Sequence, residues 1–384
     1  MKISRLPRAD ERIDITYLAR LDIKAYDYDN LYPQKVRNIL LASSTGSQCF
    51  ERYARFIEGD GLRDMAFAEA AVADDGTTAD ELVTAAARDL AMFGGFALWV
   101  GYGVSTAGYV VNEVKPLPFE ACRLTEGDDV RYIGRIAVHH DWAGRSTVNG
   151  RRDIPSEDTV QYLHRFNLSQ AAIAAQVEAA GGIDFYAGQV LWVSTAGRDT
   201  YPTPKYDSVL TELSTDEGLS NVKFRNVRNN FLPSCMFITR EGESLDNDSD
   251  SAPRGGYAQD LARFQGDERS NNILHMTVGP NEDPPEIREF PTKNYDKDFA
   301  VTDASVVERI YSAFEQEPFL AIRNGKLGFS GDVIADAYTY YSLLVNKEQR
   351  TIERALAKVF ANFKENINPG GDYSIKPLIY IAPQ

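Results

Sequence analysis

One stretch decides how this chain is organised. Residues 201–233 read YPTPKYDSVLTELSTDEGLSNVKFRNVRNNFLP. Proline is excluded from helix interiors, so the prolines at both ends bound a helix, which we predict over 206–230. At 1.5 Å per residue this helix is about 38 Å long. Three basic residues lie in its C-terminal half, where cations suit the helix dipole: Lys223, Arg225 and Arg228.

The chain beyond residue 230 predicts an insert between two long helices. Residues 231–292 hold two short apolar runs that we expect to be strands, at 235–239 and 273–278, around a helix at 257–264. A second long helix is expected at 298–315. The remaining predicted segments are a glycine-bearing loop over 317–331, a helix over 332–366 and a strand-like run at 378–381.

The first half of the chain predicts a β-rich unit with flanking helices. Residues 90–112 carry no charge, which raises the question of a membrane span. Glycines and a Ser-Thr-Ala-Gly turn divide this stretch into two apolar runs, so we interpret it as a buried hairpin and expect no membrane partner. Further strands are expected at 121–124, 132–139, 159–163 and 190–194, and helices at 36–57 (broken at 43–46), 80–92 and 168–180.

The composition is that of a globular protein with an acidic surface. Of 384 residues, 43% are hydrophobic and 25% are charged, which excludes wholesale disorder. The net charge of −15 argues against a general nucleic-acid coat, which would need a basic surface. Three cysteines, far apart in sequence, suggest neither a disulfide framework nor a zinc site.

Several short motifs resemble known binding sites but lack residues that those sites require. The glycines of residues 101–108 have the wrong spacing for a dinucleotide loop, and Asn324-Gly-Lys326 lacks the first glycine and the Ser/Thr of a P-loop. The acidic run at 246–250 opens like an EF-hand but lacks its glycine and final glutamate. His139 and His140 fall on a predicted strand, where neighbours point to opposite faces, so we expect them not to share an ion. We predict no catalytic residue, no metal and no cofactor.

One helix carries a cationic face. Lys347, Arg350, Arg354 and Lys358 follow one another at spacings of three, four and four residues, opposite an apolar face. Either this is an ordinary amphipathic helix with solvated cations, or the helix lines an assembly interface or a channel.

Three features together resemble the portal proteins of tailed bacteriophages, which connect head to tail. The first is Asn30-Leu-Tyr-Pro33 before a helix, followed by Cys49 and Gly59-Asp-Gly-Leu62. The second is Tyr201–Tyr206 leading into a long helix that ends near Pro233. The third is a helix, Glu317-Pro318, a glycine-containing loop and a long helix from Asp332. The likeness lies in the order and spacing of these segments, which cover most of the chain.

The resemblance implies an α+β portal-like subunit. Its segments would be an N-terminal arm and β-rich wing (1–205), a first stem helix (206–230), a clip (231–292), a second stem helix (293–316), a tunnel loop (317–331), a long wing or tunnel helix (332–366) and a short C-terminal strand segment (367–384), with the crown minimal or absent.

The resemblance also implies a function without enzymatic chemistry. Copies of the chain would form a ring, usually of twelve subunits, at one vertex of the capsid. Double-stranded DNA would be packaged and ejected through this ring. The other implied partners are the major capsid protein, the terminase large subunit and a head–tail adaptor or neck protein. The implied location is the virion, after assembly in the host cytoplasm.

Candidate site residues follow from the same resemblance. Arg323, Asn324 and Lys326 would meet DNA from the tunnel loop, and Lys223, Arg225 and Arg228 would supply charge to the stem and channel. Residues 240–298 hold 14 acidic against 7 basic residues. The acidic residues that would dock the motor or neck proteins are Asp246, Asp248, Asp250, Asp260, Asp267 and Glu268.

Two alternatives remain open from the sequence. One is another ring-forming component of the head–tail connection. The other is a soluble, acidic carbohydrate-active hydrolase, because 20 tyrosines and 3 tryptophans can stack on sugars while carboxylates act as acid and base. The hydrolase needs a carboxylate-lined pocket, whereas the portal needs a large ring with a central hole.

Overall fold

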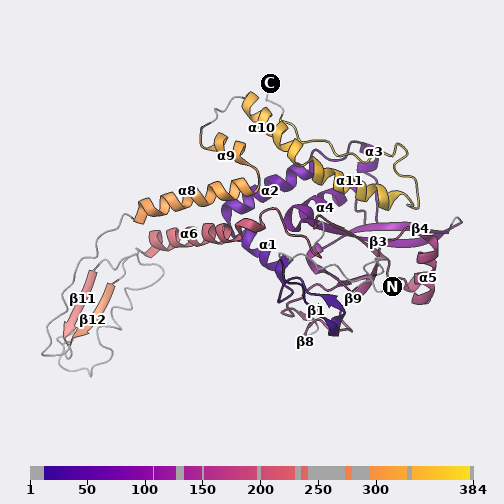
Figure 1. Cartoon of the computed structure of the whole chain (residues 1–384), viewed down its shortest axis with the longest axis horizontal. Coiled ribbons are helices and arrows are strands. Elements are labelled where there is room, and N and C mark those ends of the chain that lie inside the picture. Colours follow the sequence, from indigo (N-terminus) through magenta and orange to yellow (C-terminus); the bar gives the residue numbers. More distant parts are fainter. Residues whose placement is uncertain are drawn as a thin grey trace, which may run out of the picture. The chain divides into compact units, whose positions relative to one another are not determined.

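The computed structural model describes residues 13–106, 108–126, 134–148, 151–196, 200–229, 235–240, 273–278, 295–326 and 331–380. Packing divides the chain into two units. The larger unit combines residues 1–213 with residues 308–384, and the smaller unit holds residues 214–307. The α-helices and several of the strands are labelled in Figure 1. The fold class is α+β, as predicted.

A mixed sheet of six strands forms the centre of the larger unit. Its order is β4-β3-β10-β9-β6-β5, and only β10 and β9 pair in parallel. A parallel pair needs a long crossover, which α5 (Gln170–Ala180) and the 3-10 helix η3 (Ile183–Phe185) supply here. The strands are β3 (Gly95–Ser105), β4 (Gly108–Leu117), β5 (Cys122–Leu124), β6 (Arg135–Val138), β9 (Gln161–Arg165) and β10 (Gln189–Ser194).

Small elements surround this sheet. Two antiparallel ribbons are β1 (Tyr17–Leu18) with β2 (Ile23–Lys24), and β7 (Thr147–Val148) with β8 (Arg151–Arg152). The 3-10 helices η1 (Ala19–Leu21) and η2 (Phe119–Ala121) precede β2 and β5.

The predicted hairpin over 96–114 is confirmed. β3 and β4 pair in antiparallel fashion, with Val100 opposite Val114, and both valines are fully buried. The uncharged stretch therefore comprises the last turn of α4 (Ala79–Phe93) and most of the β3–β4 hairpin, which forms one edge of the sheet. Within the described residues, no helix combines the length and apolar character needed to cross a membrane.

Helices cover this sheet. α4 (Ala79–Phe93) and α11 (Asn346–Phe360) contact it, and α2 (Ser44–Glu58) packs on α4 (Figure 1). α4 begins with a capping box, in which Thr78 and Glu81 bond each other's backbone amides. The predicted break at 43–46 is confirmed, because Ser43 ends α1 (Tyr32–Ala42) and caps α2 by accepting the Gly46 amide at 2.9 Å. A short helix, α3 (Met65–Ala68), precedes α4.

A buried arginine attaches the segment before α1 to the sheet. Arg123 of β5 is fully buried, and its guanidinium donates to the side-chain and backbone oxygens of Asn30 at 2.5 and 2.6 Å. It also donates to two backbone carbonyls and lies between the rings of Tyr26 and Trp142. A buried charge is tolerated only when its donors are satisfied in this way.

The smaller unit holds the predicted insert. α6 (Leu210–Asn229), preceded by the 3-10 helix η4 (Asp207–Val209), leads into it, and α8 (Tyr295–Ala313) leads out. The predicted strands are confirmed as β11 (Cys235–Arg240) and β12 (Ile273–Val278), which pair in parallel. The predicted helix at 257–264 lies outside the described residues.

The last quarter of the chain differs from the prediction in three places. Residues 317–323, expected in a loop, form the helix α9 (Glu317–Arg323). The single helix expected over 332–366 is two helices, α10 (Gly331–Leu344) and α11, with Val345 between them. No strand forms within 378–380; the extended contact lies earlier, where Ile375 bridges to Leu62.

Candidate functional site

The tip of α9 presents the three residues expected at the tunnel loop. Arg323, Asn324 and Lys326 are all exposed at its C-terminal end. The helix ends at Arg323, and Gly325 after it has a φ of 69°, the left-handed conformation that glycine favours. The amides of Gly325 and Lys326 donate to the carbonyls of Ile322 and Ala321 at 3.0 and 2.9 Å, which is the Schellman pattern of a helix end. The sequence-predicted residues are therefore brought together on one defined turn.

A buried glutamine fixes the base of α9. Gln316 is fully buried, and its Oε1 accepts from Arg52 Nη1 at 2.7 Å. Its Nε2 donates to the Cys49 carbonyl at 2.8 Å and to the Tyr341 hydroxyl at 2.9 Å. Gln316 thereby connects α2, the start of α9 and α10, so the exposed tip stands on a fixed support.

Aromatic rings complete this support. Phe319 of α9 packs against Phe56, Tyr338 and Tyr341, with ring centroids 5.6 to 5.9 Å apart. Arg52 lies over the Phe319 ring at 4.8 Å. At the tip, Arg323 Nη1 is 3.3 Å from the Tyr311 hydroxyl. The side chains can therefore offer two cations and an amide to an anion without moving the helix.

Ion pairs join α6 to α8 in each unit. In the smaller unit, Lys223 Nζ lies 2.7 Å from Asp303 Oδ2. In the larger unit, Arg309 Nη1 lies 3.0 Å from Glu212 Oε1. From one pair to the other the position on α6 rises from 212 to 223, while the position on α8 falls from 309 to 303. The two helices are therefore antiparallel neighbours. Lys223, predicted to supply stem or channel charge, is half-exposed and already paired.

The side chains of the other charged residues that the sequence predicts as functional lie outside the described part of the structure. The side chains of Arg225 and Arg228 lie outside the described part of the structure, as do Asp246, Asp248 and Asp250. The same holds for the remaining predicted docking residues Asp260, Asp267 and Glu268. Their roles stay predictions.

The cationic face on α11 is confirmed as an exposed stripe. Lys347, Arg350, Arg354 and Lys358 are all exposed, whereas Ile352, Leu356 and Val359 on the opposite face are buried. No ion pair involves these four side chains within the described residues. On a chain with a net charge of −15, this stripe is available to an anionic surface.

A cleft near α2 tests the hydrolase alternative. Its volume is about 440 Å³, and its lining includes Glu51, Glu58 and Arg88. Both Glu51 oxygens accept from Arg88, at 2.7 and 3.1 Å, and Glu58 accepts from the Thr84 hydroxyl at 2.7 Å. Since both Glu51 oxygens are bonded to the same arginine, neither is free to face a sugar, and this cleft does not favour glycoside hydrolysis.

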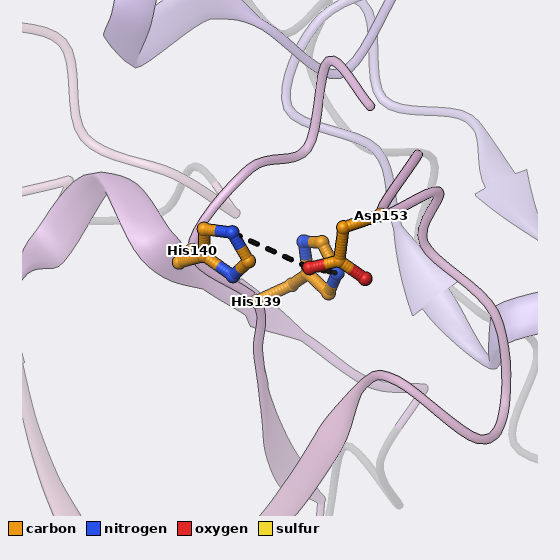
Figure 2. A group of neighbouring side chains, drawn as sticks. All are labelled: His139, His140 and Asp153. Carbon is orange, nitrogen blue, oxygen red and sulfur yellow. Dashed lines mark ion pairs between the residues drawn. The ribbon is translucent and has the colours of Figure 1, made fainter. Parts of the chain in front are cut away.

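Sequence reasoning missed one cluster. His139, His140 and Asp153 lie together after β6 (Figure 2). The expectation that the two imidazoles point to opposite faces is wrong, because β6 ends at Val138 and the alternation of a strand no longer applies. Their rings stack instead, with centroids 5.0 Å apart. Asp153, which comes back through the β7–β8 ribbon, has no signal in the sequence that pairs it with them.

Comparison with known proteins gives similar solved structures but no sequence relative. No protein-family model matches the chain, and no curated protein matches it. A chain in a virion of a native gene transfer agent (GTA) particle is 14% identical, with a TM-score of 0.44 over 90% of this chain and 81% of that one. Chains from a neck of a native GTA particle computed with C12 symmetry and a neck of an empty GTA particle computed with C6 symmetry are also 14% identical. Their TM-scores are 0.46 and 0.45, over 86% and 96% of this chain and 81% and 87% of those chains.

Proposed function

We propose that this chain is a portal-type subunit, a non-enzymatic component of a ring through which double-stranded DNA enters and leaves a capsid. The antiparallel pair α6 and α8 supports this role more than any other observation. Two helices of 20 and 19 residues lead into and out of the insert that carries β11 and β12. Cross-helix ion pairs hold them side by side. This is the stem-and-clip order that the resemblance predicts.

Ring closure needs a surface that meets a different surface on the next copy. α10 offers apolar side chains for such an interface, since Leu343 and Tyr340 are 70% and 49% exposed. Aromatic and aliphatic side chains of this kind are what interface cores bury. We propose that α10 takes part in the contact between neighbouring subunits.

DNA that must slide through a ring should meet few cations. Each lysine or arginine bound to a phosphate releases counterions and strengthens binding, which would slow movement. The α9 tip fits this need, because it offers Arg323, Asn324 and Lys326 on a fixed support and no more. We propose that these residues touch the DNA backbone, and that motor and neck proteins dock on the insert.

Quaternary state tests the ring. We expect the purified protein to form an annulus in negative-stain images, with a mass of roughly 510 kDa for twelve copies of 42.8 kDa. Mass photometry across a range of concentrations checks the subunit number. A monomer at every concentration, and in the native particle, would refute the proposal.

Paired variants test the α9 tip. Arg323→Ala with Lys326→Ala should leave the ring intact but reduce packaging or retention of DNA. The control is Arg20→Ala with Arg63→Ala, which removes the same charge from exposed positions elsewhere in the larger unit. Equal behaviour of the two double variants would assign the effect to net charge and exclude a specific role for the tip.

A further inference from the structure

We propose that His139, His140 and Asp153 form a binding site for a zinc ion. Figure 2 shows the two imidazoles and the carboxylate gathered at one point. His139 and His140 directly follow β6, and Asp153 directly follows β8. The candidate ligand atoms all lie within 4.8 Å of one another.

The backbone places these residues without help from an ion. The His139 amide donates to the Ala121 carbonyl at 3.0 Å, and the Asp153 amide donates to the Ser146 carbonyl at 3.0 Å. The Asp141 carboxylate accepts the amides of the turn between them, including that of Ala143 at 3.0 Å. The backbone on both sides of the site is therefore anchored, so only side-chain adjustments are needed to bind an ion.

The distances between the side chains suit an ion better than a direct contact. Nε2 of His139 and Nε2 of His140 lie 3.5 and 3.3 Å from Asp153 Oδ2. Hydrogen bonds of this type are usually about 2.7 to 3.2 Å long. Two ligands bonded to one tetrahedral zinc at about 2.0 to 2.2 Å lie about 3.4 Å apart.

Burial supplies an independent reason. The His139 side chain is 1% exposed, and its Nε2 has no hydrogen-bond partner. A buried polar atom left unpaired is rare, and a bound ion would satisfy it. Asp153 is 14% exposed, whereas His140 is 60% exposed and gives the ion a way in.

Ligand chemistry selects the ion. Imidazole nitrogen suits zinc, copper, nickel and iron, whereas magnesium and calcium prefer oxygen ligands alone. Two histidines and one carboxylate leave one position of a tetrahedral zinc for water. Among these metals we propose zinc, because it undergoes no redox change and commonly takes tetrahedral sites made of histidine and carboxylate ligands.

Binding must move one proton and one ring. Nδ1 of His139 accepts the Asp141 amide at 3.1 Å, so its imidazole proton sits on Nε2, facing Asp153. Zinc takes the Nε2 lone pair, so this proton transfers to Nδ1 and the Asp141 amide loses its acceptor. The exposed His140 ring must tilt out of its stack on His139 and away from Ser146 Oγ, which lies 3.1 Å from its Nε2.

The bound ion would connect the end of β6 to the end of β8. It would therefore tie the β7–β8 ribbon to the central sheet in the folded state only. A ligand that binds only the folded state stabilises it by mass action, so zinc should raise the melting temperature of the larger unit.

Zinc titration of the untagged, chelator-treated full chain tests the site. We expect one Zn²⁺ per chain with a dissociation constant of about 1 µM or less, measured by competition with a chromophoric chelator. His140→Ala and Asp153→Asn should each weaken binding at least about tenfold, and both should fold because His140 is exposed and Asn matches Asp in shape. His164→Gln, which removes a histidine of β9, is the control and should bind zinc as the native chain does.

A second readout follows the predicted proton transfer. Zinc should shift the amide resonance of Asp141 and reduce its protection from hydrogen exchange in the native chain but not in His140→Ala. Failure to bind zinc below about 0.1 mM, or equal affinity in His140→Ala, Asp153→Asn and the native chain, would overturn the proposal. These outcomes leave the ring proposal untouched, because it does not depend on an ion.

Discussion

Asp89 should make the stability of the larger unit depend on pH between about pH 4 and pH 7. This side chain of α4 accepts the Phe119 amide at 3.1 Å. Burial, against the opposing effect of that hydrogen bond, raises the pKa of its carboxyl from 3.8 to about 7. The perturbation is Asp89→Asn, which keeps an oxygen acceptor for the Phe119 amide and cannot ionise.

The sign follows from proton counting. Between pH 3.8 and pH 7 the folded state holds a proton on Asp89 that the unfolded state has released, so stability falls as the pH rises. The difference of about three pKa units corresponds to about 4 kcal/mol.

Urea unfolding at pH 5, 6, 7 and 8 measures the effect. Trp192 reports on this region, since its ring stacks on Phe119 with centroids 4.3 Å apart. The stability of the native chain relative to Asp89→Asn should fall by about 2.6 kcal/mol between pH 5 and pH 8, and acid effects elsewhere cancel in this difference. A difference that stays constant over this range would show that the Asp89 carboxyl is ionised in the folded state and would refute the reasoning.

Three further substitutions have defined outcomes. Arg123→Met should lower the free energy of unfolding by about 3 to 5 kcal/mol, because the Asn30 side chain and three backbone carbonyls lose a buried donor and each unsatisfied acceptor costs about 1 kcal/mol. A loss below about 1 kcal/mol in urea unfolding would contradict this. Gly59→Ala should cost about 2 to 4 kcal/mol, because φ is 70° and a Cβ would overlap the Lys376 carbonyl oxygen. Gly325→Ala is the matched control, because Gly325 has a similar φ of 69° but no atom within 4 Å of the added Cβ, and it should cost only about 1 kcal/mol. Equal losses of stability in the two variants, in thermal or urea unfolding, would show that the overlap with Lys376 at Gly59 is irrelevant. Arg350→Gln with Lys358→Gln should change the free energy of unfolding by less than about 0.5 kcal/mol, since both side chains are exposed and form no ion pair with any described residue. Calorimetry checks this, and a larger loss would mean that the stripe has partners within the fold.

The elements that sequence reasoning found were those with strong local signals. The hairpin of β3 and β4 follows from glycines and alternating apolar runs, and α4 from its apolar stripe. The α11 stripe is as predicted because residues three and four apart share a helix face. Arg323, Asn324 and Lys326, predicted as tunnel-loop residues, lie together at the C-terminal end of α9, and their contact with DNA stays a prediction.

The misses have physical causes that one sequence does not show. The glycines of residues 317–331 predicted a loop over the whole segment, but its first part forms α9, in which Pro318 lies in the first turn, where proline is favoured. At the break at Val345 the packing partners change: both helices contact α2, but α10 also packs on α9, whereas α11 also packs on α4 and the sheet. The burial of Gln316 and the approach of Asp153 to two histidines depend on contacts between segments far apart in the chain.

The split of the larger unit across the sequence has a consequence during synthesis. Residues 308–384 supply α9, α10 and α11, so the first 213 residues emerge from the ribosome long before the helices that cover them. Domains usually fold as units when their residues become available. Nascent chains should therefore be unable to associate with one another while residues 214–307 are still being translated. Assembly would then begin only from subunits whose interior is already closed.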